Sequence, residues 1–168
     1  SASANGKAVA CSGSATTWVA ASTTGAKIIS IGLVAGNVVG VNLQGVEEAF
    51  VKDLQTGAIE VASLNAAGQL TGVGIVALSG QAISDDGRYV VYASNAGNIV
   101  PGVGSGTIQV YVRDLATDTT ALASRTPAGV PASSQSDPGA ISPTGRFVSF
   151  RSFATNLAKA GFIVCVIA

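Results

Sequence analysis

The sequence contains no histidine and no methionine, and it is poor in charge and in aromatic rings. Without histidine, the chain cannot build the Ser-His or Cys-His pairs of nucleophilic enzymes or most zinc sites. Charged residues make up 11% of the chain and cancel to a net charge of zero, so there is no basic surface for nucleic acid or an anionic membrane. We therefore expect no catalysis, no bound cofactor or metal, and no nucleic-acid partner.

The absence of methionine predicts that an N-terminal segment has been removed or that the sequence is part of a longer one. Ser1 suits the start of a mature exported protein. We therefore expect an extracellular or cell-surface location after removal of an N-terminal signal, with the periplasm as the alternative. The most apolar stretch, residues 28–41, is interrupted by polar residues and glycines and is too short to span a membrane as a helix.

The chain has two cysteines, Cys11 and Cys165, which are far apart and lack the spacing of metal ligands. Buried thiols are the favoured interpretation, and a disulfide between them is the alternative if the protein is exported. Adjacent carboxylates occur at Glu47 and Glu48, but consecutive residues of a strand face opposite sides, so the two do not converge on one substrate.

The most informative feature present is a repeat. The segment AISDDGRYVVYASNAGNIVPG at residues 82–102 returns as AISPTGRFVSFRSFATNLAKAG at 140–161, and the opening SASANGKAVACSGSA aligns with both. In this register Gly6, Gly87 and Gly145 are equivalent, and each precedes a basic residue and an apolar run. Such spacing is typical of a tight turn in which glycine supplies a positive φ before a strand. It predicts equivalent strands at residues 6–14, 88–95 and 146–152.

A second pattern repeats with a different offset. FVKDLQTGAIEVASLNAAG, from residue 50, aligns with YVRDLATDTTALASRTPAG, from residue 111, which makes Asp53 and Asp114 equivalent. Because both aspartates recur beside a basic residue and a turn, we interpret them as structural acceptors of hydrogen bonds. The difference between the two offsets predicts an insertion at residues 18–45. No segment carries a long helical period, so the fold is expected to be all-β.

This order of turn, strand, Y-V-x-D-L strand, turn and strand resembles the PD40/TolB-like β-propeller repeat family. The resemblance is carried by residues 83–94 and 110–117, and also by residues 50–57 and 141–152. It implies antiparallel sheets arranged radially as blades, with the packing between neighbouring blades as the core.

Repeats of about 60 residues divide the single domain 1–168 into just under three blades. We place blade 1 at about 1–76 with its insertion at 18–45, blade 2 at about 77–135, and a partial blade 3 at about 136–168. Closed propellers typically contain four to eight blades. The predicted array is therefore incomplete at both ends and open unless other subunits complete it.

Two functions follow as hypotheses. The first is an exported structural protein that assembles with itself head-to-tail, as a filament or a ring, because the apolar segment GFIVCVIA would pair as a strand with the first blade of another subunit. The second is a ligand- or protein-binding TolB-like propeller module of which this chain is a fragment. The predicted assembly interface consists of Phe162, Ile163, Val164, Val166 and Ile167.

Overall fold

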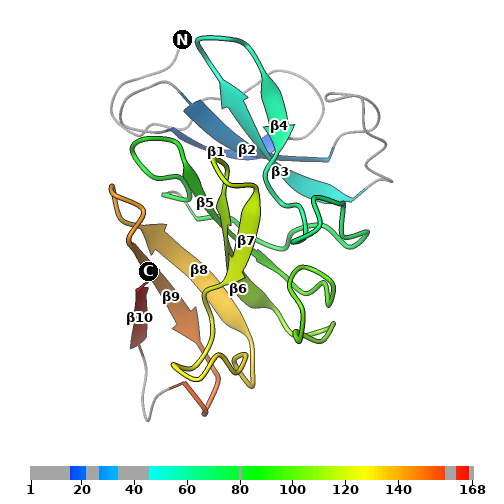
Figure 1. The fold of residues 1–168 in the computed structure, drawn as a ribbon, viewed down its shortest axis with the longest axis vertical. Helices are drawn as coiled ribbons and strands as arrows, with labels where there is room; N and C mark the ends of the chain where they lie inside the picture. The colour runs from blue at the N-terminus through cyan, green and yellow to red at the C-terminus, as the bar shows by residue number, and fades with distance from the viewer. Residues whose placement is uncertain (1–15, 22–26, 34–45, 80, 158–161, 167–168) are drawn as a thin grey trace.

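A computed structural model describes residues 16–21, 27–33, 46–79, 81–157 and 162–166, and within these ranges the chain is all-β with no helix (Figure 1). Accordingly, no helix in this part of the chain is long and apolar enough to cross a membrane. The strands are β1 (Thr16–Ala21), β2 (Lys27–Leu33), β3 (Glu47–Asp53), β4 (Ile59–Val61), β5 (Tyr89–Ser94), β6 (Gln109–Asp114), β7 (Thr119–Leu122), β8 (Ser136–Ile141), β9 (Phe147–Ser152) and β10 (Phe162–Val166).

The strands form three antiparallel sheets, each from one consecutive stretch of chain. The first sheet has the order β1-β2-β3-β4, the second β5-β6-β7 and the third β10-β9-β8. The second sheet lies between the other two (Figure 1). The sheets form an open array rather than a ring, which agrees with the expected incomplete set of propeller blades.

Two apolar layers hold the array together. Val90 and Tyr92 of β5 face the first sheet and pack with Val51 of β3, whereas Val91 faces the third sheet and packs with Val148 and others of β9. The strand β5 is thus buried on both faces, as its run of small β-branched and aromatic residues favours.

The turns at residues 84–87 and 142–145 have the same geometry. In each, the glycine N–H donates to the serine carbonyl at 2.9 Å, and the glycine φ is 71° or 73°. The serine hydroxyl accepts from the backbone N–H of the first strand residue, Tyr89 at 3.0 Å and Phe147 at 2.9 Å. The strands β5 and β9 then begin where the repeat predicts them.

The first sheet differs from the expectation. The predicted strand at residues 6–14 and the turn residue Gly6 lie outside the described residues, while β2 lies within the segment that we interpreted as an insertion. The strand β2 pairs with β3 as β5 pairs with β6, because Lys27 lies opposite Asp53 and Tyr89 lies opposite Asp114. The sequence STTGAK before β2 has the same S-x-x-G spacing as the other turns, which sequence comparison alone did not select.

The C-terminal strand β10 also differs. We expected it to pair with a sheet of another subunit, but one of its edges pairs with β9 of the same chain, from Phe162 opposite Arg151 to Val166 opposite Phe147. The prediction was wrong for that edge. In the third sheet β10 pairs with β9, just as β6 pairs with β5 in the second sheet. Ile167 lies outside the described residues.

Candidate assembly site

The third sheet lies on the second through its glycine turn. The backbone of Gly145 approaches the ring of Tyr89 so closely that a Cβ at this position would lie 2.1 Å from Tyr89 Cδ2. Beside it, the Asp85 N–H donates to the Pro143 carbonyl at 2.9 Å. The aromatic residue at the start of β5 is therefore covered by the turn of the third sheet, and only glycine leaves room for this contact.

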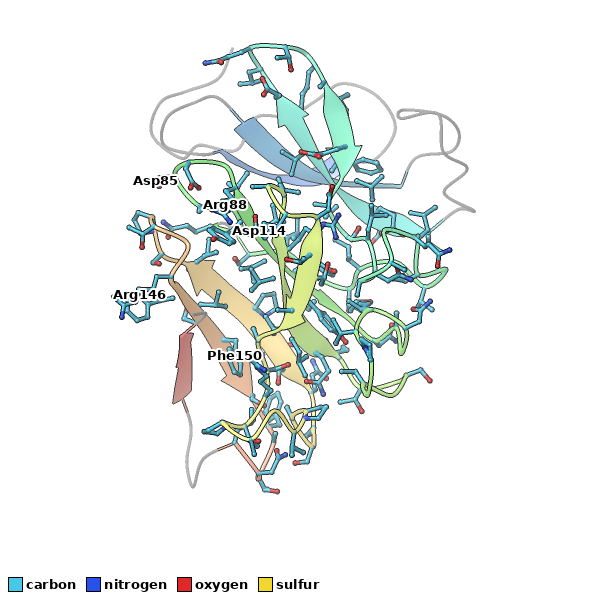
Figure 2. The ribbon with its side chains drawn as sticks, viewed as in Figure 1. Asp85, Arg88, Asp114, Arg146 and Phe150 are labelled. Carbon is cyan, nitrogen blue, oxygen red and sulfur yellow. The ribbon has the colours of Figure 1, made fainter. Side chains whose placement is uncertain are left out.

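The equivalent aromatic residue of the third sheet is Phe147, and it is 38% exposed. It lines a surface hollow of about 270 Å³ together with Ala140, Pro143 and Ser149. The Arg146 guanidinium lies 5.1 Å from the centre of its ring, and Figure 2 shows Arg146 pointing away from the sheets. Among the described residues, no glycine turn covers Phe147 as Gly145 covers Tyr89.

We call the side of the third sheet that points away from the second sheet its forward face, formed on β9 by Phe147, Ser149 and Arg151. The intervening residues, Val148 and Phe150, are buried against the second sheet. Arg151 donates to Asp137 of β8 at 2.6 Å on this face. Hydrogen bonds from Gln135 and Arg151 lower the pKa of Asp137. The forward face is thus apolar near the turn and charged at its far end.

The edge of the third sheet is the second part of the candidate site. In the first and second sheets, the strands β3 and β6 each carry a short outer strand, β4 or β7. Within the described ranges, the equivalent strand of the third sheet, β10, stands at the edge of its sheet. Backbone groups along such an edge are a template for an added strand.

The repeated aspartates lie at the ends of β3 and β6. The Asp53 carboxylate accepts from the N–H groups of Gln55 and Thr56 at 2.8 and 3.0 Å. Asp114 accepts from the Ala116 N–H at 2.9 Å and from Nε and Nη2 of Arg88 at 2.8 and 2.7 Å. Figure 2 shows Arg88 and Asp114 side by side. The hydrogen bond from Arg88 lowers the pKa of Asp114 to about 2.

Replacing Asp114 with alanine is expected to lower the free energy of unfolding at pH 7 by about 1.5–3 kcal/mol, the scale of one backbone hydrogen bond to a charged group. The contribution of the ion pair to this value is small, because Arg88 is partly exposed and screened by solvent. Since the folded pKa lies below the ordinary value of 3.8, the contribution is present above that pH and is lost as the pH falls toward 2. Urea unfolding at pH 7 and pH 2.5 measures it.

The matched control for this prediction is Asp114→Asn, which keeps an oxygen for the Ala116 N–H but removes the charge. It is expected to lose less stability than the alanine variant at pH 7. Equal losses in both variants would show that the backbone hydrogen bond is not the main contribution.

A buried polar pair recurs at the start of β3 and β6. In the second sheet, the Ser124 hydroxyl donates to Gln109 Oε1 at 2.5 Å, and Gln109 Nε2 donates to the Ala132 carbonyl at 2.8 Å. In the first sheet, Ser63 donates in the same way to Glu48, whose side chain is fully buried. The second carboxylate oxygen of Glu48 has no hydrogen-bond partner among the residues that the structure describes. Burial raises the pKa of Glu48 to about 7.

Sequence reasoning missed this pair, although a signal was present. Glu48 and Gln109 lie 61 residues apart, as do Ser63 and Ser124, which is the offset of the repeat. Glu48 therefore occupies in the first sheet the buried position that Gln109 occupies in the second. In both sheets the side chain accepts a hydrogen bond from a serine hydroxyl. Within the part of the chain that the structure describes, no three metal-ligating side chains gather into a site for a metal ion.

No protein-family model and no curated protein matches the chain. Among solved structures, it is similar to TolB from Acinetobacter baumannii, with 16% identity and a TM-score of 0.42 over 86% of this chain. It is also similar to the tricorn protease, with 17% identity and a TM-score of 0.39 over 76% of this chain. The chain spans 30% of the TolB chain and 14% of the tricorn chain.

Proposed function

We propose that this chain is an exported structural protein that assembles head-to-tail with further copies of itself. The observation that supports the proposal is that β10, among the described residues, is at the edge of the third sheet, whereas the first and second sheets carry an outer strand at this position. A strand supplied by another subunit would complete the third sheet in the same way. Because the donor and the acceptor are different surfaces, the contact is heterologous and gives a ring or a filament.

The energetics favour an interface that combines an edge with an apolar surface. Each added backbone hydrogen bond contributes about 1 kcal/mol net, while association costs at least about 4 kcal/mol in lost translational and rotational freedom. Because β10 is five residues long, the hydrogen bonds along its edge would contribute barely more free energy than association costs. The exposed ring of Phe147 at the start of β9 supplies apolar area, whose burial would add to the free energy of association.

Sedimentation of the purified chain over a hundredfold range of concentration tests the proposal. We expect species heavier than one chain of 16.5 kDa, with a fraction that increases with concentration. A single species of 16.5 kDa at the highest concentration would contradict self-assembly. Intact mass of the protein from its natural source separates the second hypothesis, since a binding propeller of which this is a fragment would have a much larger mass.

A further inference from the structure

The second sheet carries a surface hollow beside its outer strand β7. The hollow has a volume of about 290 Å³ and is lined by β7, by the segment between β5 and β6, and by the hairpin that follows β7. We call it the β7 hollow. Its walls include buried Val103 and Leu122, with Thr120, Arg125 and Pro131 beside them. The volume lies at the lower end of the range for ligand sites, so the hollow suits a small side chain rather than a large ligand.

The hairpin at residues 124–132, which borders the β7 hollow, repeats the hairpin at residues 63–71 of the first sheet. In both, the N–H of the third residue donates to the carbonyl of the seventh, at 2.9 Å in the first sheet and 2.8 Å in the second. The second and eighth residues of the first hairpin are Leu64 and Leu70, and both pack against the apolar cluster of their own sheet. These two positions are therefore apolar in the first sheet.

The second sheet has Arg125 and Pro131 at these two positions, and they form a bridge across the hairpin. Both line the β7 hollow together with Leu122. A guanidinium on a flexible chain thus replaces a leucine that packs against its own sheet. The exchange places a positive charge and apolar surface in one hollow.

The charge of Arg125 has no ion pair with another residue of the described ranges. The other two arginines of the second sheet are paired, Arg88 with Asp114 at 2.7 Å and Arg113 with Asp118 at 2.8 Å. A guanidinium binds a carboxylate through two parallel hydrogen bonds. The β7 hollow therefore favours a ligand that combines a carboxylate with a small apolar group.

The outer edge of β7 borders the same hollow. In the described part of the chain, β7 is the last strand of its sheet on that side. The Ala123 N–H, just after β7, donates to the Val110 carbonyl of β6 at 2.8 Å. Because hydrogen bonding alternates along an antiparallel pair, the backbone groups of Thr120 and Leu122 point away from β6. Backbone groups directed outward in this way can pair with an added extended strand.

We propose that the β7 hollow and the edge of β7 bind an extended acidic peptide of a partner protein, whose carboxylate pairs with Arg125 while an apolar side chain enters the hollow. Alternate residues of a strand face the same side, so the acidic and apolar residues of the peptide lie two positions apart. The edge supplies main-chain hydrogen bonds, the hollow accepts a side chain, and the charge of Arg125 selects a carboxylate. The site lies within the second sheet and is independent of the proposed self-assembly.

The probe is the peptide Val-Thr-Glu-Thr-Val, capped at both ends so that its glutamate carries the only charge. Saturation-transfer nuclear magnetic resonance observes the peptide signals and therefore serves for a monomer and an assembly alike. We expect transfer to the valine methyl groups at millimolar peptide. Exposed ion pairs are weak, so Arg125→Leu should raise the Kd about fivefold. The matched control Lys52→Leu removes the same charge from an exposed position of the first sheet and should leave the Kd unchanged.

Two changes in the peptide keep the test decisive if Arg125→Leu fails to fold. Replacing the glutamate with glutamine should raise the Kd for the wild-type chain by the same factor, and it should have no effect on Arg125→Leu, because the pair is already lost. A peptide with N-methyl groups on every residue should not bind, since it cannot pair with β7. Equal affinities for the glutamate and glutamine peptides would overturn the carboxylate contact, and binding of the N-methylated peptide would overturn strand addition.

The remaining outcomes concern the occupant. If no saturation transfer occurs at millimolar peptide, the proposal is wrong. Sedimentation of Arg125→Leu should match that of the wild type, because Arg125 takes no part in the proposed head-to-tail contact. An altered sedimentation of this variant would identify the occupant as a second copy of the chain and would overturn binding of a partner peptide.

Discussion

Replacing Gly145 with alanine should lower the free energy of unfolding by about 2–5 kcal/mol. The backbone φ of Gly145 is 73°, a conformation that costs an L-residue with a side chain about 1–2 kcal/mol. In addition, the new Cβ would meet the ring of Tyr89 at 2.1 Å, and relieving such an overlap costs about 1–3 kcal/mol. Equilibrium unfolding in urea measures the sum.

The control separates the backbone from the contact between sheets. Gly129 has a φ of 83° and nothing within 4 Å of a built Cβ, so Gly129→Ala incurs the conformational cost alone. Gly145→Ala should be more destabilising than Gly129→Ala, and the difference should shrink when Tyr89 is also changed to alanine. Equal losses at the two glycines would show that the turn does not pack against Tyr89.

Replacing Glu48 with glutamine should stabilise the protein at pH 8 by about 3 kcal/mol and change little at pH 4. The pKa of Glu48 rises on folding from its ordinary 4.5 to about 7, chiefly by burial. The folded state therefore holds the proton more strongly, so wild-type stability is highest below pH 4.5, falls between pH 4.5 and 7, and stays low above that. One pKa unit corresponds to about 1.4 kcal/mol. Glutamine cannot ionise and keeps the acceptor for Ser63.

The adjacent residue provides the control for this effect. Glu47 lies next to Glu48 on β3 and is exposed, so Glu47→Gln should not remove the loss of stability between pH 4.5 and 7. Urea unfolding of the three proteins at pH 4, 6 and 8 gives the comparison. A wild-type stability that is flat over this range would contradict the burial of an ionisable carboxyl at Glu48.

The parts of the fold that sequence predicts well are those fixed by local chemistry. The glycine turns before β5 and β9 can be predicted because they need only a residue that adopts a positive φ. The strands after them can be predicted because they are runs of residues that favour strands. The first sheet was harder to predict. The copy of the turn motif at residues 3–6 is followed by a basic residue, whereas the copy at 22–25 is not, yet it is the latter that precedes β2.

Features that depend on packing between sheets were not predictable from one sequence. The exposure of Phe147 and the partial burial of the equivalent Tyr89 follow from which sheet has a neighbour. Their sequences around the turn are nearly the same. The full burial of Glu48 likewise follows only from the assembled first sheet.

The burial of β5 on both faces has a consequence for how the chain opens. In an array where each sheet contacts only its neighbours, stability is a sum of the intrinsic terms and the interfaces between adjacent sheets. Among the described residues, the second sheet has an interface with each of the other two sheets, and each of those has an interface with the second sheet alone. The free energy of local opening is therefore lowest at the ends, and amide hydrogens of β5 and β6 exchange mainly through global unfolding.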